Sequence, residues 1–198
     1  MLIIGLTGSI ATGKSTVSMM LRRMGFPVHD ADQTVHHLIS AYGAAVPDIL
    51  AAFGASVGRT DTGINRKRLG DMVFGDAGKK AVLEGILHPL VYRDKQRFIR
   101  QARCHRHKAV FLDVPLLFET GGDAGCDHVI TVWSPAFIQR QRALRRHGMT
   151  EQKLNAILSA QYPQPDKKRL SDFSLPSSLG QAETHKRLKK WLKSLRLL

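Results

Sequence analysis

The residues with the clearest chemical capacity lie near the N-terminus, where Gly8–Ser15 reads Gly-Ser-Ile-Ala-Thr-Gly-Lys-Ser. This spacing matches G-x-x-x-x-G-K-[ST], a loop whose backbone N–H groups turn inward and bind phosphate oxygens. In such a loop Lys14 supplies a mobile cation to the β- and γ-phosphates, and the hydroxyl of Ser15 is offered to Mg²⁺. This segment, the P-loop, therefore predicts a nucleoside triphosphate site.

The P-loop lies between two elements that suit it. Leu2–Leu6 is a short apolar run typical of a buried parallel strand, and Ser15–Met24 carries apolar residues at helical spacing. Gly25 stands where a helix C-cap belongs. Because the N-terminus of a helix attracts anions, the order strand, loop, helix strengthens the interpretation of the motif.

Two carboxylates, Asp30 and Asp32, follow the second expected strand, Phe26–His29. A right-handed crossover would set this strand beside the P-loop strand, and ligands of open α/β sheets bind outside the carboxyl ends of strands. A carboxylate there can accept the proton of a substrate hydroxyl during phosphoryl transfer. The two side chains would share a face if the strand continued, whereas a turn would separate them. The alternative is that both are turn or capping residues.

A third carboxylate, Asp113, ends the apolar run Ala109–Leu112, which predicts another core strand. Such an aspartate can approach Mg²⁺ directly or through water. Many buried strands end in aspartate, so a metal-binding role and a purely structural one both remain open.

An arginine-rich segment follows later in the chain. Arg142 and Arg146 are four residues apart and Gln139 lies three before Arg142, so the pattern predicts that they share a helix face. Guanidinium groups there could stabilise the charge of a transferring phosphoryl group. The alternative is an ordinary solvated basic face.

The remaining pattern predicts an α/β fold with a parallel sheet flanked by helices, because strands alternate with helices. Val129–Trp133 is a further strand, residues 33–107 are mostly helical in pattern, and Gly54–Gly63 is rich in turns. Tyr162–Gly180 is expected to be irregular, with room for one short strand. The C-terminal segment is expected to be a helix with one apolar face, formed by Leu188, Trp191, Leu192 and Leu195.

Composition limits the class of protein. The 198 residues predict one domain with inserted subdomains, and 43% hydrophobic residues are enough for a core. The formal net charge of +14 suggests polyanionic partners: nucleic acid, phosphorylated small molecules or anionic lipid. Only two cysteines occur, no apolar run approaches the ~18–20 residues of a membrane span, and no signal peptide is expected. A cytoplasmic protein is therefore expected.

The ordered set of motifs resembles the dephospho-CoA kinase family, a relative of the nucleotide monophosphate kinases, over nearly the whole chain. The P-loop alone indicates only a nucleotide-binding protein, whereas the order of the other segments is far more specific. The matching segments are Gly5–Thr16, Asp30–Asp32, Asn65-Arg66, Val73-Phe74, Leu83-Glu84, Ile86, His88-Pro89, Pro115–Glu119, Gln139, Arg142, Arg146, Gly148 and Gln161.

The resemblance implies a P-loop NTPase fold in three parts. They are a core of residues 1–32, 108–137 and 168–198, a helical insertion of residues 33–107 that binds the CoA precursor, and a lid of residues 138–167, all with approximate bounds.

The resemblance also implies a reaction, in which ATP with Mg²⁺ phosphorylates the ribose 3′-hydroxyl of dephospho-CoA. Asp32 matches the general base, and Lys14 and Arg142 complete the catalytic set. Arg66 and His88 fall in the substrate part, where they contact substrate or hold its helices, and His88-Pro89 could simply mark a helix boundary. Ser15 and Asp113 are the expected metal ligands. The residues expected to bind ATP are Gly8, Ala11, Thr12, Gly13, Lys14, Ser15, Thr16, Arg142 and Arg146.

The chain departs from the family pattern in two places. The P-loop has fewer glycines than is common, and neither Ser9 nor Ala11 is expected to need a positive φ. The asparagine element that usually follows Asp172 is absent, so recognition of adenine by that residue is not implied and the nucleotide preference stays open.

Other functions remain as alternatives. One is another nucleotide or nucleoside kinase of the same fold, and one of a different class is a basic, RNA-binding regulatory protein. Aromatic residues make up only 7%, which disfavours a base-stacking surface. A C-terminal helix lying on a membrane is a third idea, but helix packing on the core with lysines outward is favoured. No nucleic acid or stable membrane association is expected, and a monomer is expected with oligomers left open.

Overall fold

The computed structural model describes residues 1–198 and divides into two compact units. The first unit comprises Met1–His29 and Ala102–Leu198, and the second comprises Asp30–Gln101. The chain therefore leaves the first unit once, after its second strand, and returns through the end of a long helix.

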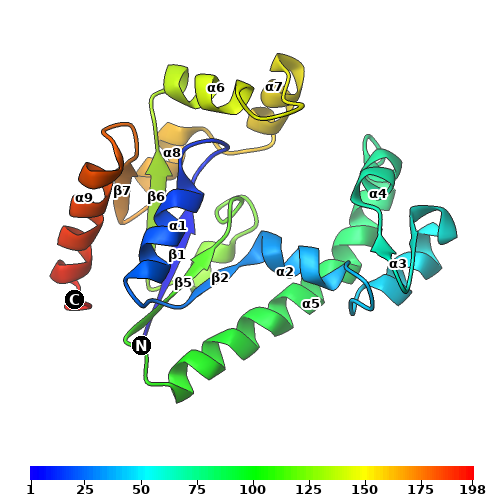
Figure 1. Ribbon diagram of the computed structural model, residues 1–198, viewed down its shortest axis with the longest axis horizontal. Helices are drawn as coiled ribbons and strands as arrows, with labels where there is room; N and C mark the ends of the chain where they lie inside the picture. Colours follow the sequence, from blue (N-terminus) through cyan, green and yellow to red (C-terminus); the bar gives the residue numbers. More distant parts are fainter. The chain divides into compact units, whose positions relative to one another are not determined.

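A five-stranded sheet organises the first unit, with the order β2-β5-β1-β6-β7 (Figure 1). Strand β1 pairs in parallel with both β5 and β6, and β6 pairs in parallel with β7. The α/β fold class with a parallel sheet is thereby confirmed. The strands are β1 (Leu2–Thr7), β2 (Val28–Asp30), β5 (Ala109–Asp113), β6 (His128–Trp133) and β7 (Phe173–Pro176).

One prediction about the sheet is wrong: β2 does not lie beside β1. Strand β5 occupies that position, with Leu6 paired to Asp113 at its end, and β2 lies at the edge of the sheet. The physical reason is the long excursion between β2 and β5. After the second unit the chain returns to the first unit at Ala102, and β5 then lies between β2 and the P-loop strand β1.

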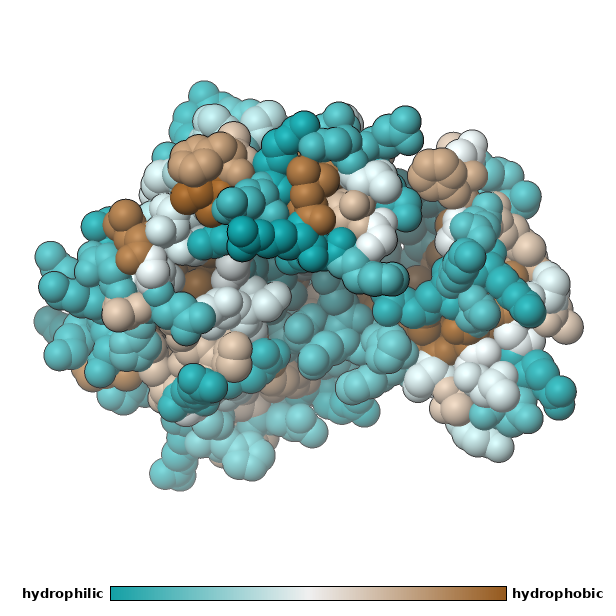
Figure 2. Space-filling view, turned by 45° about the horizontal axis from the view of Figure 1, so that its top comes forward, coloured by the Kyte–Doolittle hydropathy of each residue, from teal (hydrophilic) through white to brown (hydrophobic).

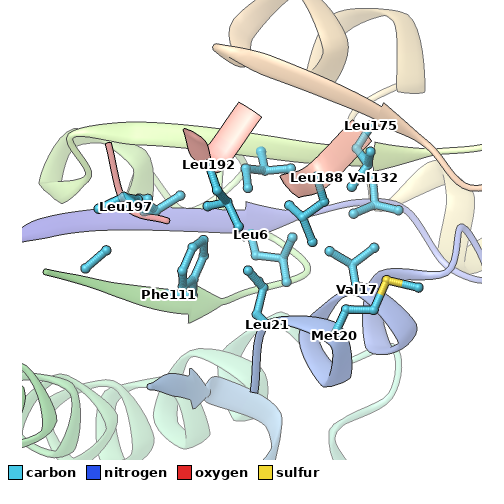
Figure 3. Close-up of a cluster of buried hydrophobic side chains, with 13 residues drawn as sticks. Leu6, Val17, Met20, Leu21, Phe111, Val132, Leu175, Leu188, Leu192 and Leu197 are labelled. Carbon is cyan, nitrogen blue, oxygen red and sulfur yellow. The ribbon is translucent and has the colours of Figure 1, made fainter. Parts of the chain in front are cut away.

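The core of the first unit lies between the sheet and two helices, α1 (Lys14–Arg23) and α9 (Gln181–Ser194). Figure 3 shows Val17 and Leu21 of α1 and Leu188 and Leu192 of α9 directed at Phe111 and its neighbours in the strands. The packing prediction for the C-terminal helix is confirmed, because its leucines are buried while its lysines are exposed. The exposed lysines of α9 are Lys186, Lys189, Lys190 and Lys193.

The segment 162–180 is more regular than its composition indicates. Helix α8 (Gln164–Leu170) lies within it, followed by β7, the short strand for which the sequence leaves room. Pro163 is the N-cap of α8 and Pro165 lies in its first turn, where a missing N–H costs no helical hydrogen bond. The prolines therefore start a helix. The prediction of irregular structure is wrong for Gln164–Leu170.

Two further helices of the first unit follow β6, namely α6 (Ala136–Leu144) and α7 (Glu151–Ser159), which lie next to each other (Figure 1). A small cluster joins Ala143 of α6 and Leu154 of α7 to Ala11 of the P-loop. The P-loop therefore shares a hydrophobic contact with both helices. A short 3-10 helix, Gly122–Gly125, completes the unit.

The second unit is mostly helical, as the sequence predicts. The turn-rich stretch becomes a 3-10 helix (Ala55–Val57) and a two-stranded antiparallel ribbon. Buried apolar side chains such as Val46, Ile49 and Leu69 form its own core. The elements are α2 (Ala31–Leu38), α3 (Val46–Phe53), β3 (Gly58–Arg59), β4 (Gly63–Ile64), α4 (Arg66–Val73) and α5 (Ala77–Cys104).

Helix α5 contains Pro89 in its interior. The interpretation of His88-Pro89 as a helix boundary is therefore wrong. A proline lacks an N–H, so one backbone hydrogen bond is lost at this point. The helix nevertheless continues over 28 residues, which shows that the packing of its flanks outweighs this local cost.

The surface matches the basic, hydrophilic composition. On the face drawn in Figure 2, hydrophilic residues predominate and apolar residues form small, separate patches. None of the helices combines the length and the apolar character that crossing a membrane would need. Both cysteines are free, so the fold uses no disulfide.

Candidate active site

The P-loop has the backbone geometry of an anion site. Gly13 is the N-cap of α1, with φ 94°, and the helix begins at Lys14. Within the protein, the N–H groups of Ala11, Gly13, Lys14 and Ser15 have no hydrogen-bond acceptor. Free N–H groups at a helix N-terminus carry partial positive charge. The loop is therefore ready to receive phosphate oxygens.

Ala11 departs from expectation, because its φ is 60°. The prediction that this residue needs no positive φ is wrong for Ala11. The left-handed conformation costs a non-glycine residue roughly 1–2 kcal/mol. The methyl group of Ala11 is buried against Ala143 and Leu154, and this contact partly offsets that cost.

Lys14 and Asp113 form an ion pair between the P-loop and the end of β5. Asp113 is only 2% exposed, and its Oδ1 accepts the hydrogen bond from the Lys14 ammonium group. The pairing of Leu6 with Asp113 across β1 and β5 brings the carboxylate to the start of the P-loop. The expected metal ligand Asp113 thus lies beside the P-loop lysine, while the side chain of Ser15 is exposed.

Arg142 also lies at the P-loop. Its Nη1 donates to Oγ of Ser177 at 2.9 Å, and its Nη2 donates to the carbonyl of Ser177 at 3.1 Å. Ser177 in turn donates to the carbonyl of Thr12. A Cβ placed on Gly13 would be 3.8 Å from Nη1 of Arg142. The structure therefore brings this predicted arginine next to the loop.

Arg146 differs from Arg142, because helix α6 ends at Leu144. The prediction of a shared helix face is therefore wrong. The N–H of Arg146 bonds to the carbonyl of Ala143 in a tight turn, and its side chain is exposed. Gly148, with φ 71°, lies in the connection between the end of α6 and the start of α7.

In the second unit, Asp30 and Asp32 have different roles. Asp30 is the N-cap of α2, and its Oδ1 accepts a hydrogen bond from the N–H of Gln33 at 3.0 Å. Asp32 lies in the first helical turn, with an exposed side chain. Helix α2 begins at Ala31, so the two carboxylates do not share a strand face. The start of a helix, and not a turn, separates them, and the expectation of a capping residue is confirmed for Asp30.

The other predicted substrate residues also lie in the second unit. Arg66 is the first residue of α4, after the N-cap Asn65, and its Nη1 lies 3.5 Å from Nδ1 of His36. His88 is exposed on α5. The structure brings Arg66 and His36 together and records no contact of His88 with either of them.

Comparison with known protein families identifies the family of this chain. The family model described as dephospho-CoA kinase matches residues 2–183. The chain belongs to the dephospho-CoA kinase family. A dephospho-CoA kinase of Rhodospirillum rubrum is 52% identical over 179 residues, which cover 90% of this chain and 84% of that relative. Membership in this kinase family confirms the resemblance that the ordered motifs indicate.

Solved structures agree with this fold. A crystal structure of a Thermus thermophilus protein has a TM-score of 0.82 at 29% identity, over 98% of this chain and 96% of that one. The dephospho-CoA kinase of Campylobacter jejuni has a TM-score of 0.65 at 24% identity, over 97% and 96%. The fold that these two structures share with this protein covers 97–98% of the chain.

Several contacts in this member of the dephospho-CoA kinase family could not be predicted from the sequence. Ser177 lies where the usual asparagine element is absent, and a serine gives no signal of a contact with Thr12. Buried Lys167 pairs with Glu119 at 2.8 Å, although its sequence context resembles a surface run of lysines. Gln139, Gln161 and Glu119 do carry a signal in the sequence, since all three belong to the matched segments.

Proposed function

We propose that this chain transfers the γ-phosphoryl group of ATP to the ribose 3′-hydroxyl of dephospho-CoA, giving CoA and ADP. This reaction is the last step of CoA biosynthesis. The observation that carries the proposal is the match to the dephospho-CoA kinase model over residues 2–183. The P-loop, with its unpartnered N–H groups, supports the same conclusion independently, because it suits a nucleoside triphosphate.

ATP is proposed to bind with its phosphates in the P-loop. The backbone of Gly8–Thr16 would surround the phosphates, and Lys14 would contact the β- and γ-phosphates. Lys14 is at present bound to Asp113, so it is held at the loop before substrate arrives. Such prior placement lowers the entropic cost of assembling the site. Arg146 is exposed beyond the end of α6, so it would contribute to phosphate binding only from the edge of the site.

Ser15 and Asp113 are proposed to hold Mg²⁺. Both offer hard oxygen donors, and Mg²⁺ is commonly held by one or two protein oxygens together with substrate phosphates and water. Oδ1 of Asp113 is occupied by Lys14, which leaves Oδ2 for the ion or for a water bound to it. When bound, the ion neutralises part of the phosphate charge.

Asp32 is proposed to act as the general base. Its carboxylate would accept the proton of the 3′-hydroxyl as the oxygen attacks the γ-phosphorus. The bond from this phosphorus to the β–γ bridging oxygen breaks, and its electron pair leaves with ADP. The position of Asp32 in the first turn of α2, with a solvent-exposed side chain, supports this role. Asp30 is engaged as the helix cap instead.

Arg142 is proposed to stabilise the charge on the transferring group, with residues 138–167 acting as a lid. Its two bonds to Ser177 keep the guanidinium at the P-loop. The helical second unit is proposed to bind dephospho-CoA, with Arg66 and His88 among its contacts. Arg66 is exposed and carries the fork geometry that suits phosphate groups.

The state and location of the protein are also part of the proposal. We propose a monomer in the cytoplasm, a reducing compartment that suits the two free cysteines. Sedimentation analysis of the purified protein and fractionation of cells test these two points separately.

A coupled assay for ADP release tests the proposed function. The acceptors are dephospho-CoA, AMP, CMP and adenosine, each at equal concentration with ATP and Mg²⁺. We expect release with dephospho-CoA to exceed the other three by orders of magnitude. Preferred use of AMP or CMP would assign the chain to a different nucleotide kinase activity. Filter binding to RNA at physiological salt tests the regulatory alternative, and tight binding without kinase activity would favour it.

A further inference from the structure

Ile10, in the middle of the P-loop, has both of its backbone polar groups bound by glutamine side chains. Its N–H donates to Oε1 of Gln161 at 3.0 Å, and its carbonyl accepts from Nε2 of Gln139 at 2.9 Å. The side chain of Ile10 also packs against the cluster of Ala11, Ala143 and Leu154. The loop is therefore held by polar and apolar contacts to α6 and to the residues around α7.

Further hydrogen bonds position each of these two glutamines. Nε2 of Gln164 donates to Oε1 of Gln139 at 2.7 Å, and the N–H of Ser134 donates to Oε1 of Gln164 at 3.2 Å. Gln139 is only 5% exposed, so water competes little for its amide. Gln139, Gln161 and Gln164 form what we call the glutamine chain. It fixes the amide of Gln139 in one orientation.

Gln161 is positioned through its neighbour Tyr162. The N–H of Tyr162 donates to Oε1 of Glu119 at 2.7 Å, and the same oxygen pairs with the buried ammonium of Lys167 at 2.8 Å. Lys167 also donates to the carbonyl of Pro115 at 3.0 Å. The backbone next to Gln161 is thus tied to the segment that follows β5.

The hydrogen bond from Gln139 decides the direction of one P-loop peptide. In a trans peptide the carbonyl and the N–H point in opposite directions. The carbonyl of Ile10 is held toward α6, so the N–H of Ala11 in the same peptide points away from that helix. This N–H has no acceptor in the protein. The next peptide begins at Ala11, whose positive φ of 60° turns the chain toward Gly13.

We infer that the glutamine chain presets the P-loop for phosphate by fixing the peptide between Ile10 and Ala11 and by holding Ala11 in its left-handed conformation. Gln139 is the positioning residue, since it acts on the phosphate only through the backbone of Ile10. The inference rests on the proposed function, in which these N–H groups bind the phosphates of ATP. It explains how a loop with alanine at a position of positive φ is kept ready for its ligand.

The substitution Gln139→Met tests the inference, because methionine keeps the length of the side chain and removes the donor. We expect the dissociation constant of ADP, measured by calorimetry with Mg²⁺, to rise about ten-fold, which corresponds to 1.4 kcal/mol. The KM for ATP should rise in parallel, while kcat falls by a smaller factor. Gln141→Met on the same helix is the control, since Gln141 is exposed, and its affinity should match the wild type.

A second substitution separates positioning from simple loss of packing. Glycine adopts the left-handed conformation without the cost that alanine carries. Adding Ala11→Gly to Gln139→Met should therefore recover most of the lost ADP affinity, with Ala11→Gly alone as reference. If Gln139→Met does not fold, Gln164→Met, which removes only the support behind Gln139, should show a loss of about three-fold.

The outcomes are distinct from those that concern the proposed function. Wild-type affinity of Gln139→Met for ADP would overturn the inference while leaving the kinase assignment intact. An affinity loss that Ala11→Gly does not repair would overturn the part of the inference that concerns Ala11, because the left-handed conformation would then not be what the glutamine maintains. Failure of the wild type to bind ADP or to phosphorylate dephospho-CoA would instead contradict the proposed function.

Discussion

At the scale of single residues, two oxygen-bearing side chains hold the two cations of the site. Asp113 binds Lys14, and Ser177 binds Arg142 while donating to the carbonyl of Thr12. Both cations therefore lie at the P-loop before any substrate is bound. In the proposed reaction they need only exchange partners, so little side-chain entropy is lost when the phosphates arrive.

Asp32→Asn tests the base. Asparagine keeps the size of the side chain but cannot accept the proton, so kcat should fall at least ~10²-fold. The dissociation constant of ATP should stay unchanged, because Asp32 belongs to α2 and not to the P-loop. The measurements are steady-state kinetics with dephospho-CoA and calorimetry with ATP. Turnover equal to that of the wild type would remove Asp32 from the mechanism.

Arg142→Ala tests the arginine at the loop. Loss of the guanidinium removes the charge that stabilises the transferring group, and kcat should fall by ~10²-fold or more. Arg145→Ala is the matched control, since Arg145 is exposed at the C-cap of α6. Circular dichroism establishes that both variants are folded. Equal rates for the two variants would contradict the role given to Arg142.

How much of the site the sequence predicts depends on the kind of contact. The P-loop follows from its motif, and Asp113 and Arg142 are candidates from an apolar run and from an arginine-rich segment; the structure brings both residues to the P-loop. The positive φ of Ala11 does not follow, because it depends on contacts with α6 that are remote in sequence. Ser177 and Gln164 are also hidden, since neutral side chains give no signal until their partners are placed.

At the scale of elements, local sequence patterns predict where strands and helices occur. They predict less well which of these elements lie next to each other in space. The runs at Leu2 and Ala109 identify β1 and β5, but only the return of the chain after the second unit places β5 between β1 and β2. Pro163 and Pro165 lead to a prediction of irregular structure, because proline breaks the interior of a helix. Proline is nevertheless well suited to the start of a helix, which is where these two residues lie. Position within the element decides which effect prevails.

Lys167→Met tests how strongly α8 is tied to the segment after β5. Lys167 is fully buried, and its partner Glu119 is 10% exposed on its side chain. Removal of the ammonium leaves a buried carboxylate without its counter-charge, which should lower the free energy of unfolding by about 3–5 kcal/mol. Lys189→Met, exposed on α9, is the control. Denaturant titration measures both, and similar values would show that the buried pair adds no stability.

At the scale of the whole molecule, the formal charge of +14 is only partly explained by the site. Part of the excess lies on the outer face of α9, whose apolar face is buried in the core. On this helix the hydrogen bond from Arg187 holds the pKa of Glu183 below its ordinary value. That pair therefore stays formed above the ordinary pKa and is lost only as the pH falls through the lowered one.

Replacement of four exposed lysines of α9 by glutamine tests whether the positive charge of this helix attracts the anionic substrates. The residues are Lys186, Lys189, Lys190 and Lys193. Each change should alter the free energy of unfolding by no more than ~0.5 kcal/mol, and kcat should be unchanged. Because the substrates are polyanions, kcat/KM should decrease at low salt and approach the wild-type value at high salt. A loss of kcat that persists at high salt would show a direct role of the helix.

The central claim concerns where the phosphoryl group goes, and the identity of the product tests it most directly. The protein is incubated with ATP, Mg²⁺ and dephospho-CoA, and the product is examined by mass spectrometry and by ³¹P nuclear magnetic resonance. We predict a product heavier by one phosphoryl group, with a new phosphomonoester on the ribose 3′-oxygen and one ADP formed per product. A phosphate at another position, or ADP formed without a phosphorylated acceptor, would contradict the account.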